Sequence, residues 1–301
     1  MTMATILNTQ TQEILLRQQS LNFRIRLDIG GANIRIEDLD IDFDVIKTNT
    51  SEPNKSKITV WNINNQTFEA IRNKTNALEL YTAFGADEYN LLFTGFPVES
   101  VKAFAQAGTI NTAQGFLASP IRQDLKGGFD IPTIIETKDA IIDYRDTTIN
   151  KTYKGQVTST EIINDCIAAL GVPISRLSPQ LPVKTFNDFV AIGKVKTILN
   201  NVTKSVGAKW SINNGTIQII TQNDQFANFG VLLNADNSER PEQQNDDLIR
   251  IKTRLLPFLQ PNDWVRCNYP QLEGTYRTQQ VRHIGNNYGT AGATEVLIGI
   301  T

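Results

Sequence analysis

Apolar and polar residues alternate with a period of two through the first third of the chain. The clearest runs are 23–28 and 39–45, where apolar residues alternate with charged ones. A period of two places the apolar set on one face of a β-strand and the polar set on the other. Further runs that predict strands are 57–62, 78–84, 90–94, 97–105, 109–117 and 133–136. Strands this short and closely spaced favour a barrel or sandwich over alternating strands and helices.

The pattern changes to helical spacing in the middle of the chain. Thr158 and Glu161 form a capping-box sequence, and the apolar stripe that follows stops at Gly171. A second stripe over 195–206 predicts another helix. The segment 209–221 then predicts a hairpin, because its central Asn-Asn-Gly suits the positive backbone angles of a tight turn. The middle of the chain therefore predicts a helix–helix–hairpin module.

The last part of the chain returns to strands after a polar segment. Residues 234–247 are dense in Asn, Asp, Gln, Glu and Pro, which predicts a mobile loop or linker. The runs that predict strands after it are 249–256, 264–269, 274–284 and 294–300. The resulting fold class is α+β, mainly β. It divides into an N-terminal tail (1–21), a first β-domain (22–155), the α+β module (156–222) and a second, smaller β-domain (223–301).

Composition narrows the range of functions. The 301 residues carry 29 Lys and Arg against 31 Asp and Glu, for a formal net charge of −2. Such a chain has no basic excess to neutralise phosphates, which argues against a DNA-coating protein. Residues 1–19 lack the pattern of a signal peptide, and 103–121 are uncharged but too polar to span a membrane. We expect a soluble protein made in the cytoplasm.

Few residues are suited to catalysis or metal binding. His283 is the only histidine, which excludes every two-histidine metal site, and Cys166 and Cys267 are the only cysteines. Cys166 falls on the apolar stripe of its predicted helix, so we expect core packing there. A pair formed by either cysteine with His283 stays open as an alternative. We expect no metal and no cofactor.

Four acidic residues occupy every second position of one predicted strand and so share one of its faces. They are Asp38, Asp40, Asp42 and Asp44. Their spacing is similar to the start of a calcium loop, but Phe43 stands where such a loop needs glycine to turn. Two interpretations remain. The carboxylates form a solvated outer face, or they line a channel and keep DNA from adhering by repelling its phosphates.

Two further groups of residues support alternative functions. Glu136, Asp139 and Asp143 are close in sequence, as a pair of carboxylates that cleaves glycosidic bonds would be, although no specific spacing supports this. The three tryptophans could stack on sugars if they were exposed, but aromatic residues in strands more often belong to the core. They are Trp61, Trp210 and Trp264. A cell-wall hydrolase and a host-surface carbohydrate-binding module are therefore the alternatives to a structural protein.

Several stretches, taken in order, resemble the baseplate hub proteins of contractile-tailed bacteriophages. The first is a Glu52-Pro53-Asn54 loop between the predicted strands 41–45 and 58–63. The second is 139–172, where Tyr-x-Gly at 153–155 precedes a helix that ends at Leu-Gly-Val. The others are a helix leading into the Trp-containing hairpin (199–220), and the stretches 255–265 and 274–287. The resemblance covers about 23–301. It departs at Asn262, where Gly is usual and which tolerates a left-handed backbone, and at Asn286, where Asp is usual.

The resemblance implies two tail-tube-like β-barrels in each subunit. Three subunits would then form a ring of pseudo-six-fold symmetry, which adapts the hexameric tail tube or a tube-initiator protein to the trimeric central spike. Residues 41–63 and 264–284 would line and close that ring, through which DNA passes without specific binding. The resemblance further implies contacts with baseplate wedge proteins, no enzymatic activity, no membrane insertion, and a place in the virion tail after assembly in the host cytoplasm.

Overall fold

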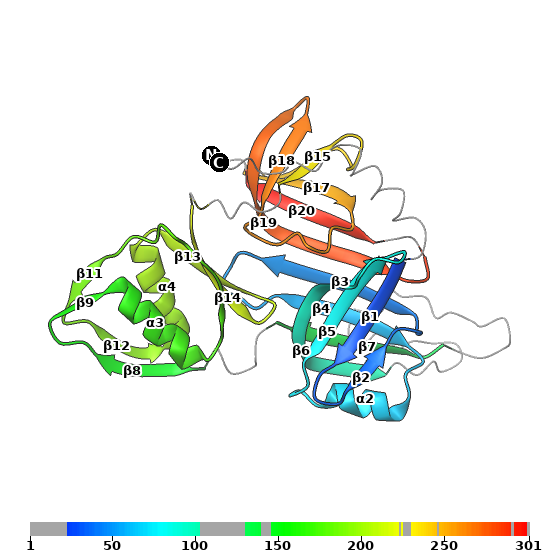
Figure 1. Ribbon diagram of the computed structural model, residues 1–301, viewed down its shortest axis with the longest axis horizontal. Coiled ribbons are helices and arrows are strands. Elements are labelled where there is room, and N and C mark those ends of the chain that lie inside the picture. The colour runs from blue at the N-terminus through cyan, green and yellow to red at the C-terminus, as the bar shows by residue number, and fades with distance from the viewer. Residues whose placement is uncertain are drawn as a thin grey trace.

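The chain folds into a β body with a smaller lobe, the middle module, at one side (Figure 1). This computed structural model describes residues 23–102, 130–139, 146–222, 224, 230–245, 247–289 and 292–299. The predicted tail (1–21), the predicted strand 109–117 and Asp143 lie outside the described residues. The prediction of a mainly β chain with helices in its middle is confirmed.

The first β region is a sheet around a large apolar cluster. Its elements are β1 (Phe23–Ile29), β2 (Ile34–Ile36), β3 (Ile41–Thr48), β4 (Lys55–Trp61), α2 (Asn65–Arg72), β5 (Leu78–Phe84), β6 (Asn90–Lys102) and β7 (Pro132–Lys138). The strand order is β3-β4-β7-β6-β5-β1-β2. Alternate residues such as Ile25, Phe43 and Leu80 are buried in the cluster, and α2 contributes Ile71. The period of two in the sequence thus produces one buried face.

The long strand β6 turns a corner within this region. Its first half pairs with β5, and its second half pairs with β7. Gly95 lies at the change of partner, where a Cβ atom would lie 2.5 Å from the Phe93 ring and 2.8 Å from the Lys138 carbonyl oxygen. Only glycine allows this close approach of strand, ring and neighbouring backbone.

The middle module has a core of its own. Its elements are β8 (Thr148–Thr152), β9 (Gln156–Thr158), α3 (Ser159–Leu170), β10 (Ile174–Leu177), β11 (Thr185–Asn187), β12 (Val190–Lys194), α4 (Val195–Ser205), β13 (Ala208–Asn213) and β14 (Thr216–Thr221). Both predicted helices are present, and the capping box forms between Thr158 and Glu161. Asn214 and Gly215 close the predicted hairpin with positive φ angles of 48° and 70°. Ile149 and Tyr153, which the sequence-based division assigned to the first β-domain, pack against this core.

The second β region surrounds a smaller apolar cluster. Its strands are β15 (Val231–Asn234), β16 (Glu242–Asn245), β17 (Leu248–Arg254), β18 (Trp264–Tyr269), β19 (Leu272–Asn286) and β20 (Ala293–Gly299). β16 pairs with β17 within the polar segment that was predicted to be a loop, so the prediction is wrong for those residues. Like β6, the strand β19 changes partner along its length, pairing first with β18 and then with β20.

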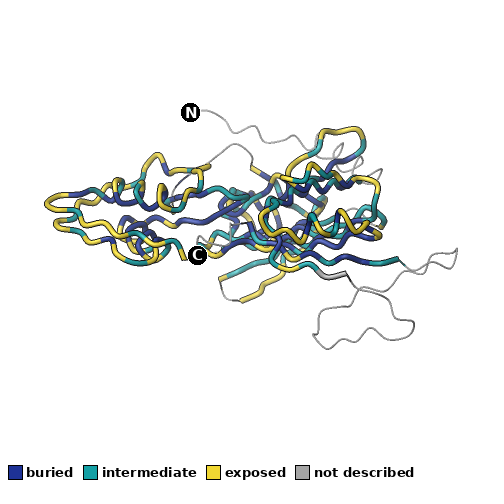
Figure 2. Tube along the Cα trace, turned by 90° about the horizontal axis from the view of Figure 1, so that it is seen from below, coloured by how far each residue is buried: buried dark blue, intermediate teal, exposed yellow. Residues whose placement is uncertain are grey.

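The two β regions are joined through one backbone ladder, which we call the seam. Antiparallel pairing of β3 with β19 runs from Thr48 opposite Gln280 to Asp42 opposite Asn286. The result is a 13-stranded sheet whose main path runs from β16 to β2. Among the described residues, no ladder closes either end of this path into a barrel. Figure 2 shows buried residues along the strands of the body and, separately, inside the lobe of the middle module.

Candidate functional site

The acidic residues divide between a strand and the turn before it. Asp42 and Asp44 lie on β3, half-buried on the face opposite Phe43, whereas Asp38 and Asp40 precede the strand. The strand begins only at Ile41 because the Asn287 side chain takes the place of a pairing strand there. Its amide oxygen accepts from the Ile41 N–H at 2.8 Å, and its amide nitrogen donates to the Leu39 carbonyl at 2.8 Å. The four carboxylates therefore do not form one continuous ladder.

Each of the two strand carboxylates has a side-chain partner, Arg282 for Asp44 and Tyr288 for Asp42. The Arg282 guanidinium on β19 donates to both oxygens of Asp44, at 2.9 and 2.7 Å, and lies 3.3 Å from Glu295 on β20. The hydrogen bond to Asp44 raises the pKa of Arg282, although burial opposes the shift. Burial raises the pKa of Asp42, which accepts a hydrogen bond from the Tyr288 hydroxyl at 3.3 Å. This face of the seam carries charges of both signs.

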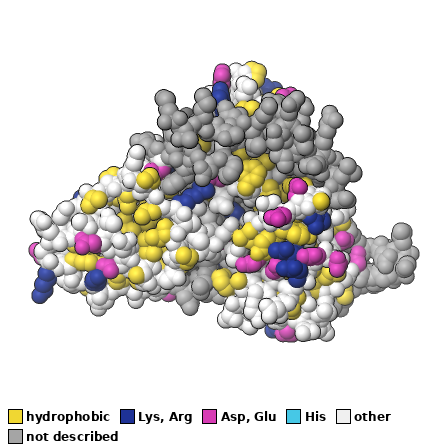
Figure 3. Space-filling model, in the orientation of Figure 1, with side chains coloured by type: hydrophobic (Ala, Val, Ile, Leu, Met, Phe, Trp, Pro, Cys, Tyr) yellow, Lys and Arg dark blue, Asp and Glu magenta, His cyan; other side chains and the backbone are white. Residues whose placement is uncertain are grey.

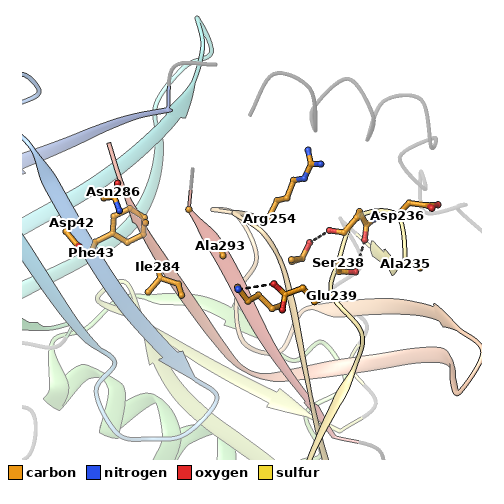
Figure 4. Close-up of a pocket in the computed structure, with 15 residues that line it drawn as sticks. Asp42, Phe43, Ala235, Asp236, Ser238, Glu239, Arg254, Ile284, Asn286 and Ala293 are labelled. Carbon is orange, nitrogen blue, oxygen red and sulfur yellow. Dashed lines mark hydrogen bonds and ion pairs between the residues drawn. The ribbon is translucent and has the colours of Figure 1, made fainter. Parts of the chain in front are cut away.

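A groove opens beside Asp42 on the same face. It has a volume of about 630 Å³ and lies between the seam and the turn that follows β15. Figure 4 shows Asp42 and Asn286 at one end and Asp236 and Glu239 at the other, with the ion pair of Glu239 and Lys252 at 2.9 Å. The lining of the groove therefore carries charges of both signs.

A second polar cluster is buried under the opposite face of the seam. Lys47 is fully buried on β3, where it continues the row of core-facing positions that includes Phe43. Near it, Asp139 accepts hydrogen bonds from the Asn54 N–H at 2.8 Å and from the Asn54 amide at 2.7 Å. The same amide donates to the Ile212 carbonyl in the middle module, at 2.8 Å. A buried network thus links the first β region to the hairpin of the module.

Burial shifts the pKa values in this cluster. Desolvation lowers the pKa of Lys47 to about 8 and raises that of Asp139 to about 7, while their mutual attraction opposes both shifts. Desolvation also lowers the pKa of His283 to about 3, and the charge of Lys47 adds to that effect. Lys47, Asp139 and His283 are buried, and none of the three lines the groove beside Asp42. Their contacts are therefore within the fold.

The carboxylates proposed for glycosidic cleavage do not face each other. Glu136 is exposed on β7, whereas Asp139 is buried and bonded to Asn54. Asp143 lies outside the described residues. The described pair therefore lacks the shared cleft that a two-carboxylate mechanism needs.

The cysteine and histidine side chains are occupied by packing and hydrogen bonds. Cys166 and Cys267 are both buried, and desolvation raises the pKa of each thiol to about 11. The two ring nitrogens of His283 contact the Thr294 hydroxyl at 3.0 Å and the Leu259 carbonyl at 3.2 Å. The hydrogen-bond partners of the His283 ring nitrogens are thus a hydroxyl and a carbonyl oxygen, and neither Cys166 nor Cys267 is among them.

The tryptophans are not arranged for sugar stacking. Trp61 and Trp210 are buried, and the half-buried Trp264 ring faces the Arg277 guanidinium at 4.8 Å from its centroid. Over the described ranges, no cluster of histidine, cysteine or acidic side chains is built to hold a metal ion. In the same part of the chain, no helix has both the length and the apolar character of a membrane span.

Solved structures similar to this chain are phage tail and secretion proteins. A 43 kDa tail protein of prophage MuSo2 from Shewanella oneidensis matches with a TM-score of 0.63 and 10% identity, over 92% of this chain and 98% of that one. A tail protein from Neisseria meningitidis matches with a TM-score of 0.59 and 10% identity, over 92% and 96%. Both alignments extend over nearly the whole of each protein.

A third structure extends the likeness beyond phages. The c3393 protein of E. coli, a type VI secretion component described as similar to the T4 tail proteins gp27 and gp5, matches with a TM-score of 0.56 and 8% identity. That alignment covers 90% of this chain and 76% of that one. No protein-family model matches the sequence, and no curated protein matches it by sequence.

The chain therefore has the fold of phage tail proteins. The resemblance to baseplate hub proteins that the sequence suggested is confirmed at the level of the fold. Asn262 has a φ of 72°, so it adopts the left-handed backbone expected where glycine is usual.

The buried cluster of Lys47, Asn54 and Asp139 was not predicted from the sequence. Lys47 occupies a position that the period of two assigns to the core face, and this mismatch was the available signal. Asn54 gave no such signal, because its partners Asp139 and Ile212 are distant in the sequence.

Proposed function

We propose that this protein is a structural hub in the baseplate of a contractile phage tail. In this role, a ring of three subunits adapts the hexameric tail tube, or a tube-initiator protein, to the trimeric central spike. The observation that carries the proposal is the seam, because it places two β regions side by side in one sheet of each subunit. The tail-protein fold supports the same role.

The sheet edges offer a means of closing such a ring. Among the described strands, the sheet ends at β2 on one side and at β16 on the other, and all residues of β16 are exposed. An exposed edge presents unpaired backbone groups that another chain can satisfy. Pairing the β16 edge of one subunit with the β2 edge of the next continues the sheet around a closed ring.

The polar face of the seam is suited to line the central conduit. Asp42 and Asp44 face away from the apolar core, and Asp44 is paired with Arg282. A surface of paired charges has little net attraction for phosphates, so DNA can pass without binding. Changing Asp38, Asp40, Asp42 and Asp44 together to lysine should trap DNA and reduce infection. Unchanged infectivity of such a phage would count against this lining.

The remaining surfaces would contact the other baseplate components. Hydrophobic side chains gather over the lobe of the middle module on the face shown in Figure 3. Val190 and Ile192 of β12 are among the exposed apolar residues of that lobe. We assign this lobe to contacts with wedge proteins, and the role of the whole chain to the virion rather than to catalysis.

The oligomeric state tests the proposal. The mass of the purified protein is measured by light scattering, and its particles are imaged in negative stain, alone and with the spike protein of the same phage. We expect a three-subunit ring with a central hole. A chain that stays monomeric even with the spike protein would contradict the hub.

A substitution in β16 tests how the ring closes. Gln244 lies in exposed β16, at the irregularity of its ladder with β17, and proline there removes one N–H from this edge strand. Gln244→Pro should lower the fraction of rings, whereas Gln244→Ala, which keeps the N–H, should leave it unchanged. Equal ring formation by both variants would exclude this edge.

A further inference from the structure

The Lys47 amine lies where the two β regions and the middle module meet. The side chain is fully buried, and its Nζ has no hydrogen-bond partner among the described residues. A buried ammonium group is tolerated only near negative charge. The carboxylates that supply it are Asp139, just after β7, and Asp263, just before β18.

Each of these carboxylates is also connected to the middle module. Asn54, which is bound to Asp139, donates to the carbonyl of Ile212 and to the side-chain oxygen of Asn213, each at 2.8 Å. The other carboxylate, Asp263, forms an ion pair of 2.8 Å with Arg176 on β10. Lys47 therefore interacts electrostatically with two carboxylates, each of which is connected to a different strand of the module.

The rest of the attachment is polar and narrow. The apolar cluster of the module is separate from those of both β regions, and no backbone ladder joins described strands of the module to the body. Further links among the described residues include Lys196 to Glu52, Arg277 to the Thr221 carbonyl at 2.8 Å, and the Trp264 indole N–H to the Asp224 carbonyl at 3.1 Å. A module attached in this way depends strongly on the balance of its buried charges.

We propose that Lys47 is a charge latch that fixes the middle module on the β body. While the amine balances Asp139 and Asp263, the joint stays closed. When this balance is lost, the joint opens and the module moves as a rigid lobe, because its own core is unaffected. The latch lies within one subunit, so it does not depend on the hub proposed above.

The charged groups around the latch predict how pH acts on it. Asp263 keeps Arg176 as a partner, and His283, the remaining titratable group facing the amine, is neutral because its pKa is lowered to about 3. Removing the amine thus leaves Asp139 as the unbalanced charge. Burial already raises the pKa of this carboxyl from 3.8 to about 7, so acid neutralises it within the closed joint. Acid should therefore close a joint that lacks Lys47, and base should open it.

Distances between spin labels on the body and the module test the latch. Lys74 on the body and Lys154 on the module are exposed, so cysteines there accept labels, whereas the native Cys166 and Cys267 are buried. In the labelled background we expect a narrow distance distribution at about pH 5.5, where Lys47 is charged, and a slightly broader one at about pH 8.5, because the pKa of the Lys47 amine is lowered to about 8 and most of its charge is lost there. Lys47→Met should stay narrow at the lower pH and become about twofold broader at the higher pH.

Two control variants separate charge balance from packing. Lys47→Met combined with Asp139→Asn removes both charges and should be narrow at both pH values. Lys57→Met removes a lysine from the other face of the same sheet and should also match the background.

Several outcomes would overturn the latch. A Lys47→Met distribution that is narrow at both pH values, or broad at both and not restored by Asp139→Asn, contradicts it. If Lys47→Met does not fold, the variant that combines Lys47→Met with Asp139→Asn distinguishes charge balance from packing. A folded double variant with a narrow distribution supports charge balance, and an unfolded one shows that Lys47 acts only through packing.

Discussion

The seam and the joint at the middle module attach parts of the same chain in opposite ways. At the seam, β3 and β19 pair through their backbones, and apolar residues of both strands enter the cores beneath. At the joint, side chains such as Asn54 and Arg176 make the connection, and the apolar cores stay apart. A backbone ladder tolerates most side-chain changes, whereas a side-chain joint depends on a few polar residues and their charges.

The difference suggests a division of labour within the subunit. The seam makes the two β regions parts of one continuous sheet, which would suit the ring proposed above. The joint lets the middle module retain its fold while its position depends on Lys47 and its neighbours. The predictions below test this contrast, beginning with the largest expected effect.

The largest loss should follow from a cavity at the seam. Phe43 is fully buried on β3, directly opposite Gly285 of β19, and packs near Phe23. Phe43→Ala should lower the free energy of unfolding by about 3–5 kcal/mol, because it removes a large side chain from a packed core. Thermal unfolding measures the change, with Phe258→Ala at an exposed position as control. Equal stability of the two variants would show that the seam does not depend on its core.

A change at the joint should cost less and act locally. Asn54→Ala removes the side-chain hydrogen bonds to Asp139 and Ile212, while the backbone N–H of residue 54 still donates to the buried carboxylate. We expect a loss of about 2–3 kcal/mol from the buried groups left unpaired. Hydrogen exchange should rise at the β13–β14 turn before it rises in α3. Asn150→Ala on exposed β8 is the control, and uniform exchange throughout the module would argue against a local joint.

The capping box tests the independence of the module. The Thr158 hydroxyl accepts from the Glu161 N–H, and the Glu161 carboxylate accepts from the Thr158 N–H at 2.8 Å. Thr158→Ala should destabilise α3 by about 1 kcal/mol without affecting the seam. Exchange rates in α3 and β3, compared with those of Thr160→Ala, measure both effects. Faster exchange in β3 would mean that module and body unfold together.

Histidine titration should reveal a pH dependence specific to the seam. The pKa of buried His283 is lowered from 6.5 to about 3, so its contribution to stability is present above the unfolded value and is lost as pH falls through that range. Asp139 has the opposite effect on stability, because its pKa is raised to about 7 and its protonation favours the folded state as pH falls below that value. This gain can mask the loss from His283. Comparing wild type with His283→Gln by urea unfolding isolates the histidine. The stability of the variant relative to wild type should rise as the solution is acidified, and a constant difference would contradict the burial of the ring.

The smallest effect should come from the exposed side of the seam. Asp44 and Arg282 are each about a third exposed, at 31% and 35%, so solvent screens their attraction. Asp44→Asn should cost at most about 1 kcal/mol, and less at high salt. Urea unfolding at two salt concentrations measures it. A loss as large as that of Phe43→Ala would mean that this face, too, holds the seam together.

Local features of the fold could be predicted from the sequence. The capping box at Thr158 and the hairpin turn at Asn214 depend on residues within a few positions of each other, so their patterns are complete in the sequence. The left-handed backbone at Asn262 likewise follows from its residue type. These elements were placed correctly because their stabilising contacts are short-range.

Features that depend on distant residues could not be predicted in this way. The acidic alternation continues through Asp38 and Asp40, yet the strand begins later because Asn287, far along the chain, occupies the pairing positions. The joint depends on Asn54 meeting Asp139 and Ile212, three residues from separate parts of the sequence. A contact between such distant residues produces no periodic pattern in the sequence.

The corner strands β6 and β19 have a mechanical consequence. The first half of β6 pairs with β5 and its second half with β7, and β19 pairs in the same way with β18 and then β20. The corner is therefore formed by a continuous strand and not by a loop. A pull on one flank of such a strand reaches the other flank through covalent bonds, without a flexible connection to absorb it. A protein built in this way transmits load around its corners instead of yielding at them.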